Sequence, residues 1–99
     1  LVAADPYDSV FHCHLGAVHH SLGELDDALQ QYNEALNLNY ANVDALVGGA
    51  EIQLSRGNLA TAISALKQAI EFDPEGLRPS TLRARSLLLA LKRAVDEHQ

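Results

Sequence analysis

A 34-residue repetition constrains this chain of 99 residues more than any other feature of its sequence. A glycine turn and the amphipathic stretch that follows it occupy residues 22–36, and the same order of small and apolar residues returns at residues 57–70. The matched pairs, each 34 positions apart, are Gly23 and Gly57, Leu25 and Leu59, Ala28 and Ala62, Leu29 and Ile63, Ala35 and Ala69, and Leu36 and Ile70. A fixed period of this length predicts stacked repeats, because one unit alone cannot bury its apolar face.

Apolar residues recur along the chain at spacings of three and four, which is typical of helices with one buried face. No stretch of strand length alternates with period two, so we expect no sheet. The predicted helices span residues 8–22, 25–38, 43–54, 59–72 and 79–97. Since short turns make neighbouring helices antiparallel, we predict an all-α fold of antiparallel helix-turn-helix repeats, an α-solenoid.

The residues at two predicted helix boundaries suggest N-caps. Asn58 stands directly before the helix at 59–72 and is expected to cap it. Asp5 or Asp8 is expected to cap the first helix.

Charge is unevenly distributed along the chain, which has a formal net charge of −6 at pH 7. Residues 1–55 contain no Lys or Arg, and five of the seven basic residues lie within 78–93. Phosphate binding needs a continuous basic face, so the acidic first half argues against a nucleic-acid partner. No apolar run approaches the ~20 residues that a membrane span requires, and we expect no span. Nothing in the sequence names a compartment, and the cytoplasm is the default expectation.

Four histidines lie around the single cysteine, namely His12, His14, His19 and His20 around Cys13. No two of these histidines are four residues apart, the helical spacing that lets two side chains share one metal ion, so we predict no metal site. The histidines beside Cys13 point away from it on a helix, and no glycine-rich loop or oxyanion-hole motif accompanies it. We therefore expect no catalytic residue, no cofactor and no enzymatic activity.

The repeated residues resemble the tetratricopeptide repeat family, a helix-turn-helix array with a 34-residue unit. In the first unit the resemblance is carried by His12, Leu15, Gly16, His19, Gly23, Ala28, Tyr32 and Ala35. In the second it is carried by Leu46, Gly49, Ala50, Gln53, Gly57, Ala62, Leu66, Ala69 and Pro74. His12 and His19 stand where the family has aromatic residues, so we interpret them as packing residues. Tyr40 stands where the family usually has proline.

The resemblance implies a single domain of two repeats and a closing helix. We interpret residues 1–8 as the tail of a preceding repeat, 9–42 as the first repeat, 43–76 as the second and 77–99 as a C-terminal capping helix. Residues 87–91 make that helix apolar on all sides, so we expect something further to cover it. Because the chain begins without Met, we interpret it as a mature product or an excised fragment.

The resemblance also implies a concave groove, lined by the first helix of each unit, that binds an extended or helical peptide. The residues expected to line it are Val10, Cys13, Ala17 and His20, then Asp44, Val47, Gly48, Glu51 and Leu54, then Arg78, Thr81, Arg85 and Leu88. Along such a groove the lining residues are first apolar, then acidic and finally basic. The first two helices lack the Lys and Asn of the family's carboxylate clamp, so we expect an apolar or partly basic peptide.

Two glycines in sequence, Gly48 and Gly49, interrupt the predicted third helix. Each costs roughly 1 kcal/mol relative to Ala in a helix interior, so a reason for their presence is expected. One hypothesis is that Gly48 lets a ligand backbone approach the groove closely. The other is that it accommodates a bulky neighbour, Tyr40 or Phe72.

We therefore expect a non-enzymatic protein–protein interaction module, a scaffold or adaptor whose partner is a protein or peptide. A second hypothesis keeps the fold but makes it the substrate-recognition segment of a larger enzyme. A third makes the chain a homo-oligomer that associates through its C-terminal helix.

Overall fold

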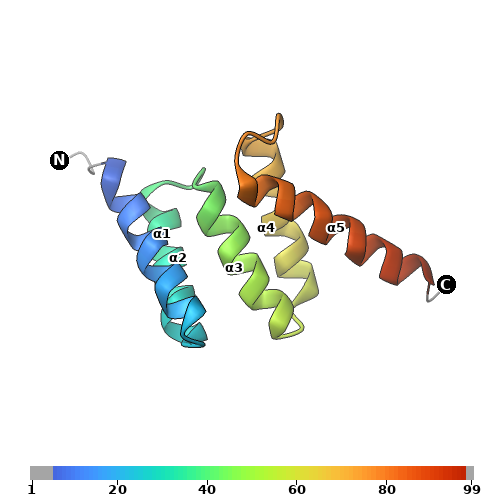
Figure 1. The fold of residues 1–99 in the computed structure, drawn as a ribbon, viewed down its shortest axis with the longest axis horizontal. Helices are drawn as coiled ribbons and strands as arrows, with labels where there is room; N and C mark the ends of the chain where they lie inside the picture. Colours follow the sequence, from blue (N-terminus) through green and yellow to red (C-terminus); the bar gives the residue numbers. More distant parts are fainter. Residues whose placement is uncertain (1–5, 98–99) are drawn as a thin grey trace.

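The computed structural model describes residues 6–97 and forms five helices in that range (Figure 1). They are α1 (Pro6–Ser21), α2 (Leu25–Leu38), α3 (Val43–Ser55), α4 (Leu59–Phe72) and α5 (Pro79–Glu97). No strand occurs among the described residues, so the predicted all-α fold is confirmed. The predicted bounds of α2, α4 and α5 are those observed, while α1 and α3 differ from prediction by one or two residues at an end.

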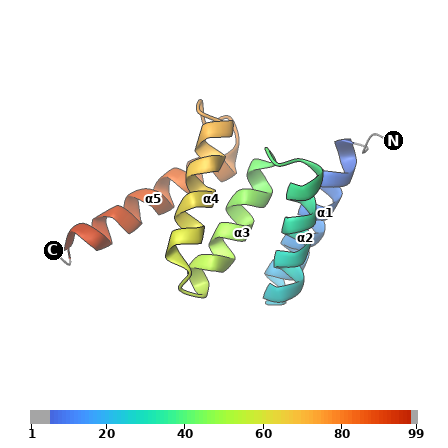
Figure 2. The same ribbon diagram turned by 180° about the vertical axis from the view of Figure 1, so that it is seen from behind.

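Consecutive helices run antiparallel and stack side by side into an elongated molecule (Figures 1 and 2). The tightest pairs are α1 with α2 and α3 with α4, and α3 also contacts α1 and α5. The first half of α5 lies across α3 and α4, and its second half then leaves the body of the molecule (Figure 1). This arrangement leaves a surface formed jointly by α1, α3 and the start of α5.

The two glycine turns are built from the same hydrogen bonds. Gly23 and Gly57 have φ angles of 78° and 80°, in the left-handed region where a side chain is strained. The Gly23 N–H donates to the His20 carbonyl, and 34 residues later the Gly57 N–H donates to the Leu54 carbonyl, both at 3.1 Å. This repeated geometry explains why glycine returns at this spacing.

The N-caps only partly follow the prediction. Asn42 caps α3, because its side-chain oxygen accepts a hydrogen bond from a backbone N–H of the first turn at 3.1 Å. Asn58 occupies the N-cap position of α4 as predicted, but without the expected capping bond. Its side chain makes no capping bond and instead donates from Nδ2 to Gln53 Oε1 across the glycine turn, at 2.7 Å. Asp8 lies inside the first turn of α1, not at its cap, and Asp5 lies outside the described residues.

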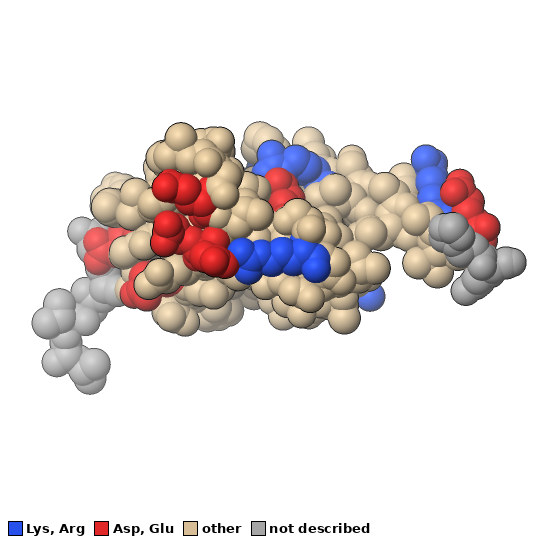
Figure 3. All heavy atoms as spheres, turned by 90° about the horizontal axis from the view of Figure 1, so that it is seen from below, with Lys and Arg blue, Asp and Glu red and all other residues tan. Residues whose placement is uncertain are grey.

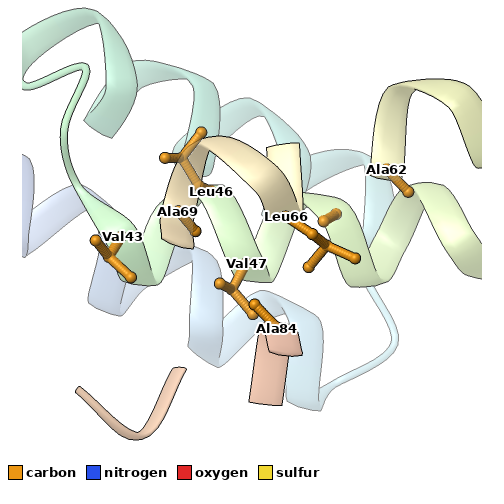
Figure 4. Close-up of a cluster of buried hydrophobic side chains, with 8 residues drawn as sticks. Val43, Leu46, Val47, Ala62, Leu66, Ala69 and Ala84 are labelled. Carbon is orange, nitrogen blue, oxygen red and sulfur yellow. The ribbon is translucent and has the colours of Figure 1, made fainter. Parts of the chain in front are cut away.

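Two clusters of buried apolar side chains hold the stack together. The first joins α1, α2 and α3 through Cys13, Ala28, Tyr32, Ala35, Ala45 and Ile52. The second joins α3, α4 and α5 through Val43, Leu46, Val47, Ala50, Ala62, Leu66, Ala69 and Ala84 (Figure 4). Tyr32 and Leu66 hold equivalent places in the two clusters, and the small residues around them let the helix backbones approach.

Asp73 anchors the start of α5. Its carboxylate accepts hydrogen bonds from the backbone N–H groups of Leu77 and Arg78, both at 3.0 Å, and from the Thr81 hydroxyl at 2.5 Å. These bonds lower the pKa of Asp73 below its usual value, and the Thr81 hydroxyl contributes most, followed by the N–H groups of Arg78 and Leu77. Because Asp73 and Thr81 are both buried, the orientation of α5 is fixed where the helix begins.

Replacing Asp73 by Asn is expected to lower the free energy of unfolding at neutral pH, because the ionised carboxylate is the form that the folded chain stabilises. This contribution is present above the ordinary Asp pKa of 3.8 and is lost as the pH falls through the lower pKa of the folded state. Urea unfolding of wild type and Asp73→Asn at a series of pH values measures the difference. Glu75→Gln changes an exposed acid of the same loop and is the control. A stability difference that persists unchanged in strong acid would contradict the assignment.

Candidate binding groove

Two adjoining hollows lie where α1, α3 and the start of α5 meet. The first has a volume of about 220 Å³ and the second about 370 Å³. Cys13, His14, Asp44 and Arg78 line both, so the two hollows form one continuous depression. The first also contains Val10, and the second is completed by Ala17, His20, Tyr32, Gly48, Pro79, Ser80 and Arg83. We call this depression the α1–α3–α5 groove.

The structure brings together most, but not all, of the residues expected to line such a groove. Those that do line it are Val10, Cys13, Ala17, His20, Asp44, Gly48 and Arg78. Val47 and Thr81 are both 0% exposed, so neither side chain is open to a ligand. Leu54 packs against the second buried cluster, together with Leu88. Arg85 donates to the Pro74 carbonyl at the other side of the loop.

The groove also has nine lining residues that were not expected from the sequence, namely His14, Tyr32, Asn39, Ala41, Asn42, Val43, Pro79, Ser80 and Arg83. Tyr32 comes from α2, the second helix of its unit, whereas the groove was expected to be lined by first helices alone. Arg83 and Ser80 line the groove because α5 does not keep the register that the repeat predicts. His14 could have been found, since it lies 34 positions before Gly48, which was assigned to the groove.

Tyr32 reaches the groove by passing between two glycines. A Cβ atom added at Gly16 of α1 would lie 2.9 Å from the Tyr32 ring, and one added at Gly48 of α3 would lie 2.5 Å from its Cζ atom. Gly48 therefore accommodates a bulky neighbour, but that neighbour is Tyr32 and not Tyr40 or Phe72. The rings of Tyr40 and Phe72 pack against each other instead, with centroids 5.6 Å apart.

The side chain of His20 completes the environment of Tyr32. The Tyr32 hydroxyl lies 3.4 Å from His20 Nδ1, and the two rings meet edge to face. The pKa of Tyr32 is raised to about 12, mainly by burial and then by the neighbouring Cys13 and Glu51, with Arg83 opposing the shift and Asp44 adding slightly to it. The hydroxyl is therefore a neutral hydrogen-bonding group at the floor of the groove.

Cys13 lies at the centre of the groove but is 6% exposed. Burial raises the pKa of its thiol to about 11, Asp44 adds to the shift, and Arg78 opposes it. Because the thiolate is the nucleophilic form, a thiol with this pKa is in its unreactive state at neutral pH. Cys13 therefore contributes a small apolar surface to the groove floor.

Two ion pairs at the edge of the groove connect α3 to Arg78, directly before α5, and to Arg83 of α5. Arg78 Nη1 lies 3.1 Å from Asp44 Oδ2, and Arg83 Nε lies 2.5 Å from Glu51 Oε1. All four side chains are partly exposed, and pairs of this kind contribute about 0–1 kcal/mol each. Figure 3 shows acidic side chains gathered over the α1–α2 end and basic ones toward α5. Within the groove, however, the pairs neutralise the acidic and basic sides.

The histidines do not come together around Cys13. His12 Nδ1 lies 2.8 Å from Gln31 Oε1, and His19 Nδ1 lies 2.9 Å from Glu24 Oε1, so both bridge α1 to the α2 segment. Among residues 6–97 the group of side chains close enough to share a metal ion is His19, Glu24 and Asp27, whose ligand atoms lie within 4.8 Å of one another. His19 and Glu24 lie close together because they form a hydrogen bond with each other. The absence of a metal site stays a prediction.

The comparisons with known proteins identify the repeat. A family model described as tetratricopeptide repeat matches residues 19–86, which is more than half of the chain. The chain belongs to the tetratricopeptide repeat family. No curated protein and no solved structure gave a significant match. Tetratricopeptide repeats generally mediate protein–protein interaction, so the functional class of this chain is protein interaction. Within the described part of the chain, none of the helices is long and apolar enough to cross a membrane.

Gly48→Ala is expected to destabilise this tetratricopeptide repeat chain by about 1–3 kcal/mol, because the added methyl group collides with the enclosed Tyr32 ring. The neighbouring Gly49→Ala is the matched control. There a Cβ meets only a methyl group of Leu29 at 3.8 Å, so the helix gains up to about 1 kcal/mol. Urea unfolding of both variants measures the contrast.

A Tyr32→Leu background tests the cause of that contrast. Leucine occupies the equivalent place in the second repeat, at Leu66. The cost of Gly48→Ala should therefore fall when position 32 carries leucine. Equal stability of Gly48→Ala and Gly49→Ala in the wild-type background would contradict the role assigned to Tyr32.

Proposed function

We propose that the chain is a non-enzymatic adaptor that binds a peptide or a partner helix in the α1–α3–α5 groove. The observation that carries this proposal is the continuity of the groove, in which side chains from α1, α3 and α5 line a single depression. Ligand pockets of proteins typically combine a mainly apolar lining with a few fixed polar groups. Here the apolar part comes from Val10, Cys13 and Ala17, and the polar part from the hydroxyl of Tyr32 and the two ion pairs.

The charges of the groove indicate the chemistry of its ligand. Asp44 and Glu51 already neutralise Arg78 and Arg83, so an acidic peptide must compete with two intramolecular carboxylates. Further acidic groups gather over the α1–α2 end of the molecule (Figure 3). An apolar segment, with a basic residue toward that end, satisfies this surface best. The same pairing makes the groove a poor phosphate-binding surface, which supports the proposal that the partner is not a nucleic acid.

Ala17→Glu tests the proposed site, because Ala17 is an exposed residue of α1 that lines the groove. Peptides selected from a displayed random library on the wild-type chain should bind Ala17→Glu at least about tenfold more weakly, which corresponds to ~1.4 kcal/mol. Isothermal titration calorimetry measures the affinities. The control is Ala60→Glu, an equally small and exposed helical position on α4, which should bind as the wild type does.

Two results would contradict the proposal. One is a set of selected peptides that bind Ala17→Glu normally and lose affinity for Ala60→Glu. The other is binding of acidic, carboxy-terminal peptides that Arg78→Ala abolishes, since that result would make the groove a carboxylate clamp.

A further inference from the structure

The second half of α5, residues 88–97, extends beyond the repeated unit. Ser55, the last residue of α3, corresponds to Leu89 at the 34-residue spacing, but α5 continues to Glu97. Figures 1 and 2 both show this half of α5 leaving the body of the molecule. It nevertheless carries large apolar side chains in water, with Leu89 51% and Val95 55% exposed.

A mainly apolar groove lies between this half of α5 and the face of α4. It has a volume of about 350 Å³ and is lined by Ile63, Lys67, Leu88, Leu91, Lys92 and Val95. We call it the α4–α5 groove. Its only charged residues are the two lysines, so its charge is positive.

The first repeat shows what occupies this place when the array continues. Leu29 and Asn33 of α2 are the 34-residue equivalents of Ile63 and Lys67, and they line a groove between α2 and α3. There, Thr61 and Ala65 of α4 complete the lining, so a helix antiparallel to α3 lies along the groove and leaves only about 150 Å³ open. No described helix takes the corresponding place on α4 and α5. The α4–α5 groove is therefore shaped for a helix antiparallel to α5.

We propose that this helix is α5 of a second copy of the chain. Each copy then inserts residues 88–97 of its own α5 into the α4–α5 groove of the other. Two identical helices related by a two-fold axis perpendicular to them are antiparallel, which is the direction that the groove requires. One surface supplies both the groove and the helix that fills it, so the contact is self-complementary and closes as a dimer.

The charges of α5 agree with this pairing. In an antiparallel pair centred near Leu91 and Lys92, Val95 of one copy lies beside Leu88 of the other. Asp96 and Glu97 then extend along the groove toward the end where α4 and α5 are joined, on the side of Lys67. The acidic end of one helix therefore lies close to Lys67 in the groove of the other copy, and the same contact is made twice.

Sedimentation velocity of the whole chain over a concentration series tests the proposal, which does not rest on peptide binding in the α1–α3–α5 groove. We expect a reversible equilibrium between monomer and dimer with no larger species. Lys67→Glu with Lys92→Glu, and separately Asp96→Lys with Glu97→Lys, should each raise the dissociation constant at least about tenfold. All four positions are exposed, so both variants are expected to fold, and circular dichroism checks this.

Mixing the two charge-reversed variants gives the sharpest result. In the mixed dimer, Asp96 and Glu97 of the Lys67→Glu, Lys92→Glu variant face the unchanged lysines in the groove of the other variant. At the second contact, the lysines introduced at positions 96 and 97 face the glutamates introduced at positions 67 and 92. Dimer should therefore return in the equimolar mixture although neither variant forms it alone, and added salt should weaken it. Phe11→Glu, which alters an exposed apolar residue of α1, should leave the dimer unchanged.

Three outcomes would overturn the proposal. The first is a wild-type chain that remains monomeric up to about 1 mM. The second is the formation of oligomers larger than a dimer that Phe11→Glu abolishes. Such a result would indicate that copies associate head to tail, through the acidic α1 end of one copy and α5 of the next. The third is a dimer that both charge reversals leave intact.

Discussion

The placement of Tyr32 between Gly16 and Gly48 is the contact on which the rest of the stack depends. Three helices meet at this ring, because α2 supplies the tyrosine and α1 and α3 each supply a position without a side chain. The ring fills space that would otherwise be a void in the first cluster, and its hydroxyl reaches the groove beside His20. One side chain therefore sets the spacing between α1 and α3 and forms part of the surface that those helices present.

Much of the fold could be predicted from the sequence, because its strongest signals are local and repeated. The glycine turns and the apolar spacing gave the five helices, and the left-handed φ angles at Gly23 and Gly57 explain why. Long-range packing was harder to predict. Nothing local distinguishes Tyr40 or Phe72 from Tyr32 as the neighbour of Gly48, since that choice depends on how α2 lies against α3. Asn58 stands at the predicted N-cap position of α4, but the bond from its Nδ2 to Gln53 on the preceding helix holds the side chain in an orientation without a capping bond.

The prediction of the groove residues was best on α1 and became worse along the chain. All four residues expected on α1 line the α1–α3–α5 groove, but only two of the five expected on α3 do, and of the last four only Arg78, directly before α5, does. The loop before α5 explains the poor match on that helix. Asp73 binds Thr81 and draws it into the core, so the helix turns Arg83 toward α3 while Arg85 reaches back to Pro74. The 34-residue spacing holds only up to the last regular turn, so it cannot predict the contact between Asp73 and Thr81.

The hydrogen bonds of Ser9 have a consequence for how this array comes apart. Ser9 is buried in α1, donates to the Ala35 carbonyl of α2 and accepts from Asn42 at the start of α3, both at 2.8 Å. In a stack whose helices touch only near neighbours, a terminal helix can in principle detach alone. Here its departure would break both hydrogen bonds of Ser9, each of which contributes about 0.5–1.5 kcal/mol. We therefore expect the cooperative unit at this end to comprise three helices, one more than the two of a single repeat.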